Sequence, residues 1–254
     1  MTRSETSRKL RLMKLSTMAD EYDMQITSPI VQQLPFEDRF QLLVDKEYEF
    51  RKHRKLNRLL RQSGISQRDA CINDMYYGKE RDLRRETVLR IGSCKFIAEH
   101  RNILCMGPTG CGKTYFSSAI GIEACKQEYT VRYVSLDDLI ADIEFSESEH
   151  PLMKRTLKYY RDPDLLIIDE FLRRKLSPAD ADRLFHIIDY RSANRKSMMI
   201  CSQFPCVNWT SQIDDPVSAD AIVDRIIHVS YHVVMNADGK GKSMREVFGI
   251  EYSS

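Results

Sequence analysis

Apolar residues divide the chain into two parts with different spacing. Up to about residue 95 they recur every three or four positions, as in helices buried on one face. One such stripe contains Phe36, Phe40, Leu43 and Val44. No alternation with a period of two, which would indicate strands, is present in this part. The first part is therefore predicted to be helical.

From about residue 102, short apolar runs alternate with helical patterns. The predicted strands are residues 102–107, 130–135, 164–170, 197–203 and 228–235. The predicted helices are residues 114–126, 136–145, 153–160, 178–194 and 219–227. Strands that alternate with helices indicate a parallel sheet covered on both faces. The expected fold is a three-layer α/β domain, residues 96–254, preceded by a smaller all-helical N-terminal domain, residues 1–95.

Composition narrows the class of protein. The chain has 254 residues, of which 42% are hydrophobic and 30% charged, as in ordinary soluble proteins. It contains no run of about 18 uncharged apolar residues that would span a membrane, and its N-terminus lacks the apolar stretch of a secretory signal. Seven cysteines without paired spacing argue against disulfides or a zinc site. These features predict a cytoplasmic protein.

The most specific motif follows the first predicted strand. Residues 107–114, GPTGCGKT, match the pattern GxxxxGK[ST]. Its glycines let backbone N–H groups point at phosphate oxygens, while Lys113 reaches the β- and γ-phosphates and Thr114 ligates Mg²⁺. The strand before the motif and the helix after it supply the context that it requires. The predicted ATP-binding residues are Gly107, Pro108, Thr109, Gly110, Cys111, Gly112, Lys113, Thr114 and Tyr115.

Polar residues end the next two buried strands and complete a hydrolytic site. Asp169 is predicted to hold Mg²⁺ through water, and Glu170 to polarise the attacking water. Gln203 would lie beside the γ-phosphate and orient water, although a simple strand-end cap is the alternative. Together with the catalytic Lys113, these residues predict a magnesium-dependent ATPase.

Basic residues are clustered although the net charge is only +2. Two clusters, residues 51–61 and 154–161, could neutralise DNA phosphates, and in the second Tyr159 and Tyr160 could stack on bases. Solvated helix faces are the alternative. No base-reading motif is present, so sequence-nonspecific binding is expected. The candidate DNA contacts are Arg51, Lys55, Arg58, Lys154, Arg155 and Lys158.

These motifs, in this order, resemble the AAA+ ATPases, and more closely the IstB-like transposition helper ATPases, which are relatives of the DnaC helicase loaders. The resemblance covers nearly the whole chain and is carried by several blocks: residues 34–61, 93–114, 201–209, 218–228 and 241–246. One departure is the run Leu172-Arg173-Arg174-Lys175, where the family usually has a small residue and then an apolar stretch.

The resemblance implies roles for two more residues and matches two further positions. Arg225 matches an arginine finger that reaches the ATP of a neighbouring subunit, and Arg245 matches a sensor arginine that touches the nucleotide of its own subunit. Gln203 matches the polar sensor position. Trp209 matches a recurring aromatic, which we interpret as a packing residue.

The resemblance also implies a function. ATP-bound homo-oligomers, as a ring, helix or filament, would assemble on double-stranded DNA, remodel it, and recruit or activate a transposase. ATP hydrolysis would then drive disassembly. A DnaC-like replicative helicase loader is the alternative, since both share the ATPase core. A small-molecule kinase is a third possibility and would have an acceptor pocket and no arginine acting between subunits.

Overall fold

The computed structural model describes residues 4–78, 82–236 and 244. Contacts within the chain divide it into two compact units, residues 1–58 and 59–254. Within the described residues, no helix combines the length and apolar character that crossing a membrane requires.

The first unit is helical, as predicted. It contains α1 (Glu5–Leu12), α2 (Ser16–Thr27), α3 (Pro29–Gln32) and most of α4 (Phe36–Ser63), which continues into the second unit. Ser4 begins α1 by accepting a hydrogen bond from the Ser7 amide, as serine commonly does at a helix start. The buried Glu47 carboxylate accepts from the Met18 amide at 3.1 Å and from Arg51 Nε at 2.7 Å. The bond from Met18 fastens α4 to α2, while the contact with Arg51 lies within α4.

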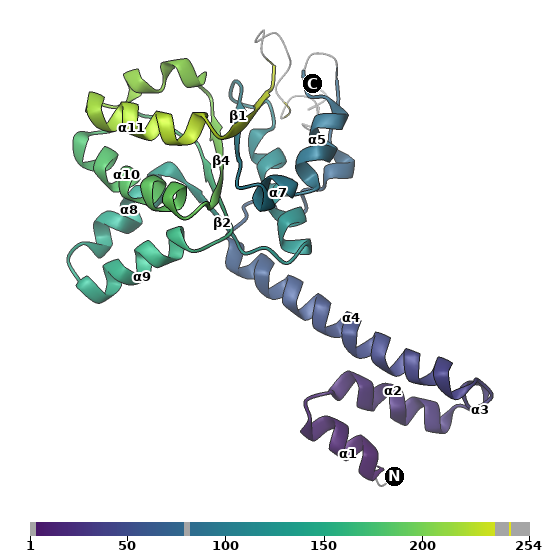
Figure 1. The fold of residues 1–254 in the computed structure, drawn as a ribbon. Coiled ribbons are helices and arrows are strands. Elements are labelled where there is room, and N and C mark those ends of the chain that lie inside the picture. Colours follow the sequence, from purple (N-terminus) through teal and green to yellow (C-terminus); the bar gives the residue numbers. More distant parts are fainter. Residues whose placement is uncertain (1–3, 79–81, 237–243, 245–254) are drawn as a thin grey trace, which may run out of the picture. The chain divides into compact units, whose positions relative to one another are not determined.

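A parallel five-stranded sheet forms the centre of the second unit. Its strands are β1 (Asn102–Met106), β2 (Val131–Ser135), β3 (Leu165–Asp169), β4 (Ser197–Ser202) and β5 (Ser230–Val234). They lie in the order β2-β3-β4-β1-β5, and every neighbouring pair is parallel (Figure 1). All five predicted strands are confirmed. Because parallel strands end at one edge, the loops after β1, β3 and β4 lie close together.

Helices cover both faces of this sheet and complete the predicted three layers (Figure 1). They are α5 (Arg85–Gly92), α6 (Lys95–Ala98), α7 (Lys113–Lys126), α8 (Leu136–Ser146), α9 (His150–Arg161), α10 (Pro178–Ala193) and α11 (Pro216–Ile227), with short 3₁₀ turns at Ile72–Asp74, Cys206–Asn208 and Thr210–Gln212. Two helices begin three residues earlier than predicted. In α11 the reason is visible, because Asp215 caps the helix and Pro216 occupies its first turn.

Alternate side chains of the strands pack against the helices on opposite faces of the sheet. Leu104, Leu166 and Ile168 face the cluster formed with α8, α10 and α11. On the other face, α7 approaches the sheet so closely that a Cβ added at Gly121 would lie 3.0 Å from side chains of Ile65 and Ile167. This period-two division is the one that strands impose.

Residues 59–95 belong to the second unit. The Cys71 amide donates to the hydroxyl of Tyr115 in α7 at 3.1 Å, and Arg132 of β2 donates to the carbonyl of Gln62. The compact units therefore divide near residue 58, and the domain boundary predicted at residue 95 falls inside the second unit. The helical pattern of residues 59–95 gave no sign that this segment packs on the sheet domain.

A buried arginine joins three elements at the edge of the sheet opposite to the carboxyl ends of the strands. Arg191 of α10 is fully buried and donates to the carbonyls of Tyr160, Arg161 and Pro163, each at 3.0 Å, and to that of Ser197 at 2.6 Å. Burial lowers the pKa of Arg191 to about 9. The guanidinium thus ties the end of α9 and the start of β4 to α10.

Candidate nucleotide-binding site

The loop after β1 has backbone angles that demand glycine. Gly110 and Gly112 have φ angles of 83° and 92°, in the left-handed region that side chains disfavour. At Gly107 an added Cβ would lie 2.8 Å from Cys111 Sγ and closer still to the carbonyl oxygen of Met235. The three glycines of the motif are therefore each required by the loop's geometry.

Lys113 begins α7 and turns back over this loop. Its Nζ donates to the carbonyl of Gly107 at 2.7 Å and to that of Pro108 at 2.9 Å. The ammonium group thus lies over the loop whose amides precede the helix. An anion at this position would meet a lysine, loop N–H groups and the positive end of a helix. Such a loop suits the phosphates of a nucleotide.

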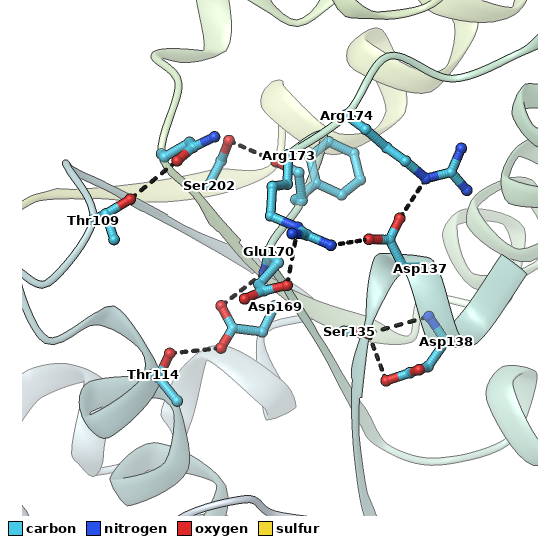
Figure 2. A network of polar contacts seen from close by, with 12 residues as sticks. Thr109, Thr114, Ser135, Asp137, Asp138, Asp169, Glu170, Arg173, Arg174 and Ser202 are labelled. Carbon is cyan, nitrogen blue, oxygen red and sulfur yellow. Dashed lines mark hydrogen bonds and ion pairs between the residues drawn. The ribbon is translucent and has the colours of Figure 1, made fainter.

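Asp169 ends β3 and accepts three hydrogen bonds, of which Figure 2 shows those from Thr114 and Glu170. Its Oδ2 accepts from the Thr114 hydroxyl at 2.8 Å and from the Tyr133 hydroxyl, while its Oδ1 accepts from the Glu170 amide at 2.8 Å. Burial and the neighbouring Asp169 charge raise the pKa of Tyr133, so Tyr133 stays a hydrogen-bond donor. Sequence analysis missed Tyr133, because nothing in the pattern of β2 indicates its contact with β3.

A cavity of about 720 Å³ collects most of the predicted site residues. This volume lies within the usual range for small-molecule sites, roughly 300–1,000 Å³. Among its lining residues are Thr109, Gly110, Gly112, Lys113, Thr114, Tyr115, Asp169, Glu170 and Gln203. The lining thus joins the ends of β1, β3 and β4, as the sheet order requires.

Gln203 follows β4 and contacts the phosphate loop directly. Its Oε1 accepts a hydrogen bond from the Thr109 hydroxyl at 3.1 Å. The adjacent Ser202 hydroxyl donates to the carbonyl of Phe171 at 2.9 Å and so links the ends of β4 and β3. Gln203 thus lies beside the phosphate loop, and its predicted position at the γ-phosphate stays a prediction.

Further lining residues come from the segment before the sheet. Gln67, Asp74 and Tyr76 border the same cavity. The Tyr115 hydroxyl holds this segment by accepting from the Cys71 amide at 3.1 Å. The sequence carried no motif for these residues, because their position depends on folding of residues 59–78 against α7.

Arg225 does not line this cavity, and Arg245 lies outside the described residues. Arg225 of α11 pairs through Nε with Asp189 Oδ1 at 2.9 Å and donates to the carbonyl of Ala221 at 3.0 Å. Trp209 is fully buried against Phe171 with ring centroids 4.8 Å apart, which confirms its packing role.

The candidate DNA contacts lie on two helices. On α4, Arg51 pairs with Glu47 and donates to the carbonyl of Lys14, while Arg58 is exposed and Lys55 half-buried. On α9, Lys154 and Arg155 are exposed and Lys158 lies 3.9 Å from Asp162.

The two tyrosines of α9 differ from what the sequence suggested. Tyr160 is only 1% exposed and its hydroxyl donates to Asp142, so it cannot stack on a base. One face of Tyr159 is covered by Arg132, whose guanidinium carbon lies 3.2 Å from the ring centroid. The helical pattern did not show which of the two adjacent rings enters the core.

The residues of the cavity fit a nucleotide with a divalent cation. Loop amides and Lys113 provide donors for phosphate, and Thr114 and Asp169 provide the oxygen ligands that Mg²⁺ prefers. No group of three or more His, Cys, Asp or Glu that could hold a metal ion occurs in the part of the chain that the structure describes. The hydroxyl of Thr114 and the carboxylate of Asp169 suit Mg²⁺, which commonly keeps waters and binds substrate phosphates.

The fold and this site define a P-loop ATPase of the AAA+ class. The model of the family described as IstB-like ATP binding protein matches residues 6–247, so the chain belongs to that family. A protein of Pseudomonas fluorescens, named as an ATP-binding protein of insertion sequence IS1162, is 30% identical over 216 residues, which cover 85% of this chain and 93% of that protein. The resemblance inferred from the sequence is confirmed.

Solved structures agree on the fold. The crystal structure of DnaI has a TM-score of 0.56 and 21% identity, and the match covers 66% of this chain and 91% of DnaI. The AMPPCP-bound structure of DnaA from Aquifex aeolicus has a TM-score of 0.55 and 22% identity, with coverage of 66% and 50%. The predicted AAA+ architecture is thus confirmed.

Proposed function

We propose that this protein is an ATP-dependent helper of transposition. ATP-bound copies assemble on double-stranded DNA, remodel it, and recruit or activate a transposase, and hydrolysis then releases the assembly. The observation that carries this proposal is a cavity that joins the phosphate loop to Asp169, Glu170 and Gln203 in a chain of the IstB-like family. A relative named for an insertion sequence, similar over 93% of its length, supports the link to transposition.

The proposed chemistry assigns each cavity residue a task. Thr114 and Asp169, whose oxygens are already 2.8 Å apart, would hold Mg²⁺, which neutralises phosphate charge when bound. Lys113 would bind the β- and γ-phosphates. Glu170 would accept the proton of the attacking water, and Gln203 would orient that water.

Arg225 is proposed to act between protomers. It is not among the described residues that line its own cavity, so its action on ATP requires a cavity from a neighbouring copy. Its side chain is 31% exposed and would exchange Asp189 for phosphate at such an interface. Arg245 is proposed to touch the nucleotide of its own subunit, because Met244 next to it donates to the carbonyl of Gly110 at 2.8 Å. ATP would thereby join protomers into a homo-oligomer.

DNA binding is proposed to rest mainly on α9. Lys154 and Arg155 are exposed there, and Lys158 has only a distant, exposed acidic partner. The α4 cluster is weaker, since Arg51 is engaged by Glu47 and Lys14. Contacts of this kind bind the DNA backbone, so affinity should fall steeply as salt rises.

The proposal is tested by ATP turnover with and without duplex DNA, together with capture of partner proteins. We expect DNA to stimulate turnover and ATP to shift the protein to larger assemblies by light scattering. Immobilised protein should retain a transposase and not a replicative helicase. Retention of the helicase alone would favour a helicase loader, and a protein that stays monomeric with ATP and DNA would contradict the proposed assembly.

A further inference from the structure

The run Arg173-Arg174-Lys175 lies beside the active site and departs from the pattern of the family. The three cations have different surroundings. Arg173 lines the nucleotide cavity, whereas Lys175 pairs with Asp214 and does not line it. We propose that Arg173 is a positioning residue that restrains Glu170, and that Asp137 releases Glu170 by competing for the same guanidinium.

A tight turn after β3 fixes the spacing between Glu170 and Arg173. The Arg173 amide donates to the Glu170 carbonyl at 3.1 Å, and Glu170 and Leu172 have φ angles of 52° and 56°. Left-handed angles at non-glycine residues store strain and are commonly retained at functional sites. The Phe171 amide holds the turn by donating to the carbonyl of Cys201 at 2.8 Å. The turn brings the Arg173 side chain back over Glu170.

The guanidinium of Arg173 contacts two carboxylates (Figure 2). Its Nε lies 3.2 Å from Glu170 Oε2, while its Nη2 lies 2.6 Å from Asp137 Oδ2. Asp137 also accepts from Arg174 Nε at 2.7 Å and stands in the first turn of α8. The shorter of the two contacts of Arg173 is therefore to Asp137, and Glu170 is the more weakly held partner.

Asp137 is ionised and can therefore compete with Glu170 for the guanidinium of Arg173. Although its partial burial opposes ionisation, hydrogen bonds from Arg173 and Arg174 lower the pKa of Asp137. It therefore remains a carboxylate at neutral pH. Since α8 leads into α9, this ion-pair network also connects the catalytic carboxylate to the α8–α9 hairpin.

The pair with Arg173 impedes the task proposed for Glu170. A general base must accept a proton from water, and a carboxylate whose oxygen is already bound by a guanidinium is less available to do so. Both side chains are more than half exposed, so the restraint is modest. An exposed ion pair of this kind corresponds to about a two- to fivefold effect on rate.

This inference rests on the base role proposed for Glu170, and steady-state ATP turnover without DNA or transposase tests it separately from the proposed assembly on DNA. We expect Arg173→Ala to raise kcat about two- to fivefold with KM unchanged, because Glu170 is freed. Asp137→Asn should lower kcat by a similar factor, because Arg173 then stays on Glu170. The double variant should behave like Arg173→Ala, and Arg173→Lys should fall between Arg173→Ala and the wild type.

Lys175→Ala is the matched control and should leave kcat unchanged. If the two residues had a merely structural role, Arg173→Ala and Asp137→Asn would change kcat in the same direction. A change in the same direction would therefore overturn the inference. So would an Arg173→Ala protein that binds ATP normally yet turns over no faster than the wild type.

Discussion

The hydroxyl of Thr114 donates to Oδ2 of Asp169 at 2.8 Å, which joins the start of α7 to the end of β3. The two residues are 55 positions apart in sequence, and β4 lies in the sheet between β3, which ends at Asp169, and β1, which leads into the loop before Thr114. Their contact therefore depends on the strand order as well as on the two motifs. It places the two expected Mg²⁺-binding oxygens together at one edge of the cavity.

This contact predicts the effect of removing the hydroxyl. Thr114→Ala should reduce ATP turnover by about 10- to 100-fold, because one oxygen ligand and the orientation of Asp169 are lost together. Thr114→Ser keeps the oxygen and should retain most activity. Turnover measured across a magnesium titration checks this, and equal losses in both variants would show that the methyl group, not the hydroxyl, matters.

The Tyr133 hydroxyl should strengthen magnesium binding by orienting the Asp169 carboxylate. Tyr133→Phe removes one hydrogen bond from Asp169, worth about 1 kcal/mol, and should raise the magnesium concentration for half-maximal turnover about fivefold. Tyr231→Phe is the control, because Tyr231 lies in β5 and its hydroxyl donates to Glu99, not to Asp169. The prediction fails if both variants need the same magnesium concentration as the wild type.

Arg225 predicts complementation between defective subunits. Arg225→Ala should bind ATP normally but turn it over about 10³-fold more slowly, the smaller effect seen for arginine fingers. Mixing Arg225→Ala with Glu170→Gln should restore part of the activity, since one interface then has both groups. If the mixture is no more active than either variant alone, Arg225 does not act between protomers.

Lys154 and Arg155 should contribute to DNA affinity through charge. Replacing both by alanine should weaken binding to duplexes of different sequence equally and should reduce the salt dependence of binding by about two charges. Fluorescence anisotropy at several salt concentrations measures this. Replacing Lys9 and Arg8 on α1 provides a charge-matched control, and an equal loss there would indicate a general charge effect.

Arg191 should be essential for stability rather than for catalysis. Arg191→Met leaves several buried carbonyls without a donor, each costing about 1–3 kcal/mol, so the free energy of unfolding should fall by about 3 kcal/mol or more. Urea denaturation measures the loss. The exposed Arg101→Met control should change stability little, and an unchanged Arg191→Met protein would show that water can replace the guanidinium.

The phosphate site could be predicted from sequence because its residues are adjacent in the chain and its geometry demands glycine. Asp169, Glu170 and Gln203 could be predicted because parallel strands end at one edge of a sheet. Tyr133 and Arg173 could not, since their partners are set by side-chain contacts between residues 36 apart in sequence. The placement of residues 59–95 was missed because a helical pattern does not reveal which surface it packs against.

Calorimetric titration with ATP and magnesium tests the central claim most directly. The account predicts that the wild-type protein binds one ATP per chain with measurable heat and that Lys113→Ala, which keeps the loop but loses the ammonium group, gives none. Equal heats from the two proteins, or no heat from the wild type, would contradict the assignment of residues 107–114 as the ATP site.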